Sequence, residues 1–171
     1  MKQLTMLCGV PGSGKSTFVD NYCARYCEDS KYMILSTDDI IQDIADRHEL
    51  TYNEVFGDIT YAFAERMMYK LAEIAFNKVD EVIWDQTNLN PKTRRRKLEV
   101  VPKDWLKLAI WFKIPDDLDD RLSSRPGKVI PKKVIDSMKK TFTVPSFGEG
   151  FDAIWEANDY LARLKYMEGI K

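Results

Sequence analysis

The chain has 171 residues, of which 44% are hydrophobic and 31% are charged, and its formal net charge is −1. This length fits one domain, residues 1–171, and the composition is that of a globular protein without repeats or low-complexity segments. No apolar run approaches the roughly 18 residues that span a membrane, and the first residues lead directly into a strand rather than a signal peptide, so we expect no membrane partner and a cytoplasmic protein.

The first predicted strand, residues 4–8, leads into the segment Gly9-Val10-Pro11-Gly12-Ser13-Gly14-Lys15-Ser16, and a helix follows from Ser16. This segment fits the pattern G-x-x-x-x-G-K-[ST], and the strand and helix on either side are the context that the pattern requires. We therefore predict a phosphate-binding loop. In such loops backbone N–H groups surround an anion, the lysine reaches the outer phosphates and the hydroxyl binds Mg²⁺, roles that fall here to Gly12–Thr17, Lys15 and Ser16.

Strands and helices alternate along the rest of the chain, which predicts an α/β fold with a four- to five-stranded parallel sheet flanked by helices. Residues 48–54 are polar and are predicted to form a turn, and residues 151–156 form either a fifth strand or the start of the last helix. The other predicted strands are residues 31–36, 81–85 and 106–112, and the other predicted helices are residues 38–47, 55–77, 118–125 and 132–142, with one more beginning at Asn90-Pro91.

One long predicted helix, residues 55–77, carries apolar side chains at steps of three and four residues. This periodicity is typical of an amphipathic helix whose apolar face packs on a sheet. We expect the packed face to consist of Phe56, Ile59, Phe63, Met67, Leu71 and Ile74.

Polar residues follow several of the predicted strands, at the edge of a parallel sheet where ligands bind. Asp85 ends a strand beside the phosphate-binding loop, where a carboxylate holds Mg²⁺ directly or through water, although a turn residue would also fit. Asp38 and Asp39 are adjacent and must point in different directions. One can charge the N-terminus of the following helix, and the other can accept a proton from a substrate hydroxyl.

Two arginines, Arg121 and Arg125, share one face of a predicted helix and are candidates for contacts with phosphates. Arg121 also lies four residues after Asp117, so an ordinary ion pair within the helix is the alternative. A basic run, Lys92 to Lys97, begins another helix, and residues 91–145 carry 15 basic and 7 acidic side chains against 8 and 15 in residues 1–90. Cations near a helix N-terminus are unfavourable, so we expect an anionic partner such as nucleic acid there.

The motifs together resemble the kinase domain of phage polynucleotide 5'-hydroxyl kinases over about residues 3–142. The resemblance is carried by Gly9–Thr17, Thr37-Asp38-Asp39, Asp85-Gln86-Thr87-Asn88-Leu89-Asn90-Pro91, Arg121–Arg125 and Gly127–Pro131 followed by Ser137-Met138. It implies a three-layer, adenylate-kinase-like P-loop kinase that uses ATP and Mg²⁺. In that family's mechanism Asp38 would be the general base, Lys15 and Ser16 would act on phosphate and metal, and Arg125 would neutralise the phosphates. We further predict that Arg121 contacts ATP and that Asp85 binds the metal. The residues predicted to contact the acceptor are Asp39, Gln86, Thr87, Asn88 and Arg94.

The chain departs from that family at three places. Ile41 stands where the family has an arginine that contacts the substrate's phosphate, Gln86 stands where it has an acid, and we expect no phosphatase module. We expect a polynucleotide 5'-hydroxyl kinase acting on DNA or RNA. The alternatives are a kinase for a small alcohol, a nucleoside or a hydroxylated base in DNA, and a nucleotide-dependent binding module without catalysis. The sequence leaves open whether the protein forms a homo-oligomer.

Overall fold

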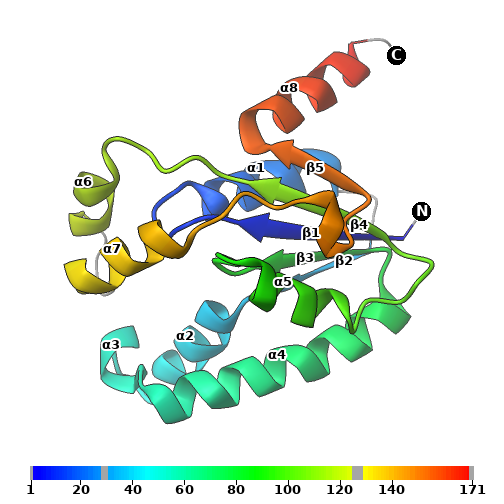
Figure 1. Cartoon of the computed structure of the whole chain (residues 1–171). Coiled ribbons are helices and arrows are strands. Elements are labelled where there is room, and N and C mark those ends of the chain that lie inside the picture. The colour runs from blue at the N-terminus through cyan, green and yellow to red at the C-terminus, as the bar shows by residue number, and fades with distance from the viewer. Residues whose placement is uncertain (1, 28–30, 125–128, 170–171) are drawn as a thin grey trace.

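The structure, a computed structural model, describes residues 2–27, 31–124 and 129–169. Its centre is a five-stranded sheet with the order β2-β3-β1-β4-β5 (Figure 1), and every neighbouring pair of strands is parallel. The strands are β1 (Gln3–Cys8), β2 (Tyr32–Leu35), β3 (Glu81–Asp85), β4 (Leu106–Trp111) and β5 (Ala153–Glu156). The predicted parallel sheet is confirmed, and residues 153–156 form its fifth strand.

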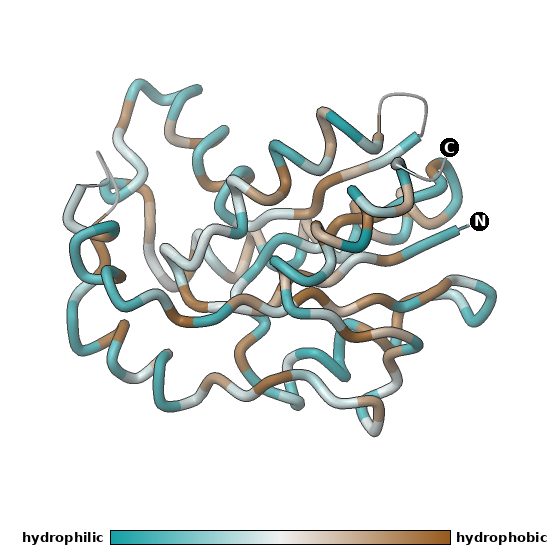
Figure 2. Tube along the Cα trace, turned by 90° about the horizontal axis from the view of Figure 1, so that it is seen from above, coloured by the Kyte–Doolittle hydropathy of each residue, from teal (hydrophilic) through white to brown (hydrophobic). Residues whose placement is uncertain are grey.

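Helices cover both faces of the sheet, as the buried runs in its central strands require. On one face α4 (Asp58–Lys78) and α5 (Pro91–Leu98) pack against Met6, Trp84 and their neighbours, and on the other α1 (Lys15–Tyr26) and α8 (Ala157–Glu168) pack against Leu7 and Ile110. Figure 2 shows hydrophobic residues gathered along the central strands and hydrophilic residues on the outer turns. The result is the three-layer P-loop kinase fold.

The buried face of α4 differs from the predicted one. The buried residues that pack against the sheet are Met68, Ala72, Ala75 and Phe76, and Leu71 of the predicted stripe packs against the same core. Ala64 packs against Ile41 and Tyr52. Several side chains of the predicted stripe are exposed, and the most exposed of them is Ile59 at 88%. Small alanines let the helix approach the sheet closely, and the prediction was wrong for the exposed Ile59, Phe63 and Ile74 but correct for Leu71.

The segment after β2 also differs from prediction. Helix α2 (Thr37–Arg47) is present as expected, but the stretch predicted to be a turn contains the one-turn helix α3 (Tyr52–Val55). A capping box stabilises α3, because the Glu54 carboxylate accepts hydrogen bonds of 2.7 Å from both the backbone N–H and the hydroxyl of Thr51. This short helix fixes the position of Tyr52, whose ring is 6% exposed.

The remaining elements are two short helices after β4 and a 3₁₀ turn just before β5. They are α6 (Leu118–Ser123), α7 (Lys132–Thr141) and the 3₁₀ turn η1 (Phe147–Glu149). Leu118 and Ile135 pack against Val10, so α6 and α7 are attached to the phosphate-binding loop (Figure 1). Among the described residues, every helix is too short or too polar to cross a bilayer.

Candidate active site

A cavity of about 720 Å³ lies at the carboxyl ends of β1, β2 and β3. Small-molecule sites in proteins typically have volumes of this order. Most of the residues that the sequence nominated line this one cavity: Gly12, Gly14, Lys15, Ser16, Thr17, Asp38, Asp39, Asp85, Gln86, Thr87 and Arg121.

The loop between β1 and α1 has the backbone conformation that its glycines permit. Gly12 and Gly14 have φ angles of 80° and 97°, in the left-handed region. A Cβ on Gly12 would also lie 2.8 Å from Cδ1 of Leu118. The Lys15 ammonium donates hydrogen bonds of 2.9 Å to the carbonyl oxygens of Gly9 and Val10, so it lies inside the curve of the loop.

The residues around this loop fit ATP and Mg²⁺, the cofactors of P-loop kinases. Ser13 Oγ is buried and has no hydrogen-bond partner within the described part of the chain. Because buried polar atoms are normally hydrogen-bonded, a bound phosphate oxygen would satisfy this hydroxyl. The N-terminus of α1 adds backbone N–H groups and the positive end of its dipole. The Ser16 hydroxyl and the Asp85 carboxylate line the same cavity and are oxygen donors of the kind that hold Mg²⁺.

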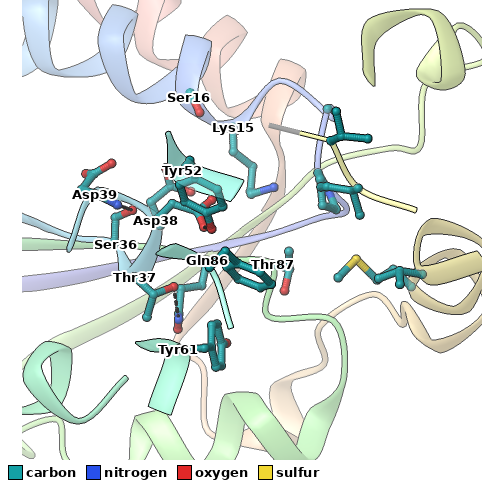
Figure 3. A pocket seen from close by; sticks show the side chains of 18 of the residues that line it. Lys15, Ser16, Ser36, Thr37, Asp38, Asp39, Tyr52, Tyr61, Gln86 and Thr87 are labelled. Carbon is teal, nitrogen blue, oxygen red and sulfur yellow. Dashed lines mark hydrogen bonds between the residues drawn. The ribbon is translucent and has the colours of Figure 1, made fainter. Parts of the chain in front are cut away.

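Asp38 lies in the first turn of α2 and lines the cavity together with Lys15 (Figure 3). Its Oδ1 accepts a 2.7 Å hydrogen bond from the hydroxyl of Tyr52. Burial, and then the Asp38 carboxylate, raise the pKa of Tyr52 far above its ordinary value, so the phenol stays protonated and remains a donor. The side chains of Asp38 and Asp39 point in different directions, as predicted (Figure 3).

Both acids lie at the N-terminus of α2, where a negative charge is favourable. The backbone N–H of Asp39 donates a 3.1 Å hydrogen bond to Ser36 Oγ, so Ser36 is the cap and both acids lie in the first turn. The Asp39 carboxylate still lines the cavity.

The loop after β3 is tied to α2 and α5 through Gln86. Its Nε2 donates to Thr37 Oγ1 at 2.9 Å (Figure 3), and its Oε1 accepts from the Trp84 indole at 3.1 Å. The buried Lys97 ammonium donates to Gln86 Oε1 and Asn88 Oδ1. Burial lowers the pKa of Lys97 to about 8. Thr37, next to Asp38, is thereby linked to the interior of the fold.

Asn88 is a structural residue of this loop rather than part of the cavity wall. It is buried, has a φ of 45°, and donates a 2.7 Å hydrogen bond from Nδ2 to the carbonyl of Leu7. The backbone N–H of Gly9 donates to the Thr87 carbonyl at 2.9 Å. These two bonds join the loop after β3 to the start of the phosphate-binding loop.

Arg94 corrects a prediction, because it was expected to contact the acceptor. Its side chain is completely buried, and it donates two hydrogen bonds to Glu149, of 2.7 and 2.9 Å, and further bonds to the carbonyls of Asn88 and Thr143. Burial by itself would raise the pKa of Glu149, but the bonds from Arg94 and Ser146 outweigh it and lower that pKa. Arg94 thus holds η1 against α5.

The basic run 92–97 is divided by its helix between the interior and the surface. Arg94 and Lys97 face inward, whereas Lys92, Arg95 and Arg96 are exposed. The run therefore presents fewer cations to a partner than its sequence suggests.

Of the two arginines predicted to contact phosphates, the structure describes Arg121 but not Arg125. Arg121 lines the cavity and forms the alternative ion pair with Asp117, with 2.8 Å between Nε and Oδ1. Arg125, predicted to be catalytic and to bind ATP, lies outside the described residues, as do Gly127 and Lys128.

Sequence reasoning missed three aromatic residues of the cavity, Tyr52, Phe56 and Tyr61. The spacing of Tyr52 and Phe56 by four residues could have indicated that both rings lie on one side of a helical turn. The sequence instead predicts a turn over residues 48–54 and places Phe56 on the packed face of the long helix. The rings of Tyr52 and Phe56 stack, with centroids 5.5 Å apart and an angle of 18° between the planes.

Together, this sheet order and a glycine-rich loop between β1 and α1 define the P-loop fold of the protein. The chain belongs to the AAA domain family, whose sequence profile matches residues 4–145.

Known proteins share the fold at low sequence identity. L-seryl-tRNA(Sec) kinase of Methanococcus maripaludis is 26% identical over 166 residues, which are 96% of this chain and 62% of that protein's length. A putative kinase from Chloroflexus aurantiacus superposes with a TM-score of 0.69 at 16% identity, covering 96% and 97% of the two chains. A chain of the Pnkp1/Rnl/Hen1 RNA repair complex superposes with a TM-score of 0.59 at 19% identity, covering 82% of this chain and 44% of that one.

Proposed function

We propose that this protein transfers the γ-phosphoryl group of ATP to an alcohol, with Asp38 as the general base. The observation that carries the proposal is the position of the Asp38 carboxylate, which shares one cavity with the phosphate-binding loop and is oriented by Tyr52. A carboxylate so held can accept the proton of a hydroxyl, which contributes typically 10²–10⁴-fold to a rate.

The donor half of the site consists of the loop and its neighbours. Backbone N–H groups of residues 12–17 bind the phosphates, and Lys15 leaves the carbonyls of Gly9 and Val10 to neutralise the outer phosphates. Ser16 and Asp85 hold Mg²⁺, which when bound offsets the negative charge of the phosphate oxygens. Arg121 exchanges its bond to Asp117 for a phosphate. Arg125, which lies outside the described residues, is proposed as a second phosphate contact because the sequence motif assigns it that role.

In the reaction, Asp38 takes the proton of the acceptor hydroxyl as the oxygen forms its bond to the γ-phosphorus. The bond from that phosphorus to the β–γ bridging oxygen breaks, and its electron pair leaves with ADP. Lys15 and the loop N–H groups stabilise the charge that develops on the phosphoryl oxygens. Asp38 later releases the proton to solvent.

The sequence motifs indicate a polynucleotide 5'-hydroxyl as the acceptor. The superposition of this protein on a chain of an RNA repair complex is compatible with such an acceptor. Such an acceptor brings phosphates that need cations. Of the described residues that line the cavity, the cationic ones are Lys15 and Arg121, both in the donor half. Ile41, at the position of the family's phosphate-gripping arginine, is completely buried.

A small alcohol, or a hydroxyl on a base, is therefore the acceptor that the geometry supports better. The acceptor half carries Asp38 and Asp39 with the amide of Gln86, and Asp85 lies beside it. Carboxylates repel a phosphate that enters the cavity, whereas they accept hydrogen bonds from a neutral polyol.

The test is an acceptor screen with γ-labelled ATP and Mg²⁺. It compares 5'-hydroxyl DNA and RNA oligonucleotides, a free nucleoside, a polyol and DNA that contains a hydroxymethylated base. The proposal expects label on at least one acceptor, and Asp38→Asn should retain ATP binding but lose transfer by about 10²–10⁴-fold. ATP binding without transfer to any acceptor, and an unchanged biological effect of Asp38→Asn, would instead establish a nucleotide-dependent binding module.

A further inference from the structure

The acceptor half of the cavity has an aromatic wall, formed by Tyr52 of α3, Phe56 just after it and Tyr61 in the first turn of α4. The ring of Tyr52 is almost fully buried, whereas Phe56 is 51% exposed. Large aromatic side chains exposed on a cavity wall are a common means of holding an apolar or planar ligand.

The Phe56 ring is held in place rather than loosely exposed. It stacks on Tyr52, and Tyr61 meets it edge-on with centroids 6.3 Å apart and 67° between the planes. The backbone N–H of Phe56 donates a 2.9 Å hydrogen bond to the Tyr52 carbonyl, which closes the capped turn of α3. A ring fixed in this way loses little conformational freedom when a ligand stacks on it.

The same wall carries the candidate general base. Tyr52 supports Phe56 through its ring and bonds Asp38 through its hydroxyl, at 2.7 Å. The surface on which a ring would stack and the carboxylate that would take the proton are therefore positioned by one residue.

We propose that Phe56, supported by Tyr52 and flanked by Tyr61, is a stacking platform for a planar ring of the acceptor. The acceptor is then an uncharged heterocycle that carries a hydroxyl directly or on an attached sugar, the chemistry of a nucleoside. This inference rests on the proposed function for the role of Asp38. The same ring chemistry is offered by a free nucleoside and by a nucleobase within a strand.

Binding measurements test the platform independently of catalysis. Thymidine, 5-hydroxymethyl-2'-deoxyuridine and ribose are titrated calorimetrically into the protein with Mg²⁺ and a non-hydrolysable ATP analogue. We expect both nucleosides to bind at least about 10-fold more tightly than ribose, because stacking of a base on an aromatic ring is worth that factor or more. Ribose binding as tightly as the nucleosides, or no nucleoside binding, would overturn the inference.

Variants locate the effect. Phe56→Leu keeps apolar bulk but removes the ring face, and it should weaken nucleoside binding about 10-fold, while Phe56→Trp should restore it. Phe63→Ala is the matched control, since Phe63 is an exposed phenylalanine of α4 that is not among the cavity-lining residues, and it should bind like the wild type. Unchanged nucleoside binding by Phe56→Leu would contradict the platform.

A third arm separates the two sources of the ring and the two proposals. An oligonucleotide with the modified base inside the strand is compared with the free nucleoside, and preference for one identifies the source. Phosphoryl transfer is measured in parallel on wild type and Asp38→Asn. If nucleoside binding depends on Phe56 but no phosphoryl transfer occurs, the proposed kinase function is refuted and the stacking platform is retained. If phosphoryl transfer occurs and nucleoside binding does not depend on Phe56, the platform is refuted and the kinase function is retained.

Discussion

The hydroxyl of Tyr52 donates a 2.7 Å hydrogen bond to Oδ1 of Asp38, across a gap of 14 residues in the sequence. The two residues come from different helices, α3 and α2, so the bond also fixes the relative position of these helices. The orientation of the Asp38 carboxylate in the cavity is thereby set by a residue of the neighbouring short helix.

Tyr52→Phe should lower the turnover number about 10-fold and leave the KM for ATP unchanged. The phenylalanine ring keeps the stacking on Phe56, so the variant removes the hydrogen bond to Asp38 alone, and such a bond to a charged group contributes about 1.5–3 kcal/mol. Steady-state kinetics with the best acceptor of the screen measure the effect. Tyr166→Phe, at an exposed tyrosine of α8, is the control and should match the wild type.

Lys15→Met should weaken ATP binding about 100-fold, since a charge-assisted contact with the phosphates is removed. The wild-type ammonium bonds two carbonyls of the loop, so a small loss of stability is also expected. Titration with a fluorescent ATP analogue measures the affinity, and Lys92→Met, at an exposed lysine of α5, serves as the control. Equal affinities for Lys15→Met and the wild type would show that the loop binds without its lysine.

Arg94→Met and Glu149→Gln should each destabilise the fold by about 3–5 kcal/mol, because each leaves a buried charged or polar partner uncompensated. Urea unfolding measures this loss. Arg25 and Glu168 form a pair of similar length, 2.6 Å, but with side chains 56% and 36% exposed, so Glu168→Gln should cost less than about 1 kcal/mol. A stable Arg94→Met protein that has lost acceptor binding would return Arg94 to the substrate site.

The stability of the wild type should rise between pH 8 and pH 10 relative to that of Lys97→Met. Burial lowers the pKa of Lys97 to about 8 in the folded state, against 10.5 for the ordinary side chain. Between these values the unfolded state binds more protons, so raising the pH favours folding, by an amount on the order of 2 kcal/mol. Urea unfolding at both pH values provides the comparison, and parallel pH dependences of the two proteins would contradict the burial of a charged Lys97.

The sheet and the phosphate-binding loop could be predicted from the sequence because their signals are local. Buried strands such as Glu81–Asp85 are short apolar runs, and the glycine pattern before Lys15 lies within eight residues. Ligands bind at the carboxyl ends of parallel strands, and this rule predicts that Asp38 and Asp85 lie near the loop. Both residues line the same cavity as the loop, so their predicted positions are confirmed.

The remaining features depend on contacts that spacing does not reveal. The prediction that Arg94 contacts the acceptor is wrong because its partner in the interior, Glu149, lies 55 residues further along the chain and no local pattern reveals the pair. The face of α4 was misassigned because Ala72 and Ala75, which pack closely, contribute little to a periodicity judged by large side chains. Tyr52 was missed because a single capped turn of helix resembles a polar loop in sequence.

The short helix α3 marks the part of the cavity wall that can vary most easily among relatives. It lies outside the sheet and has its own capping box, while the loop that binds phosphate is bonded to the β3–α5 connection through Gly9 and Asn88. Substitutions around α3 that retain Tyr52 and its bond to Asp38 can therefore reshape the acceptor wall without disturbing the phosphate-binding loop. Diversification of substrate range among relatives of this chain should concentrate in the segment between α2 and α4, and libraries that seek new acceptors are best directed there.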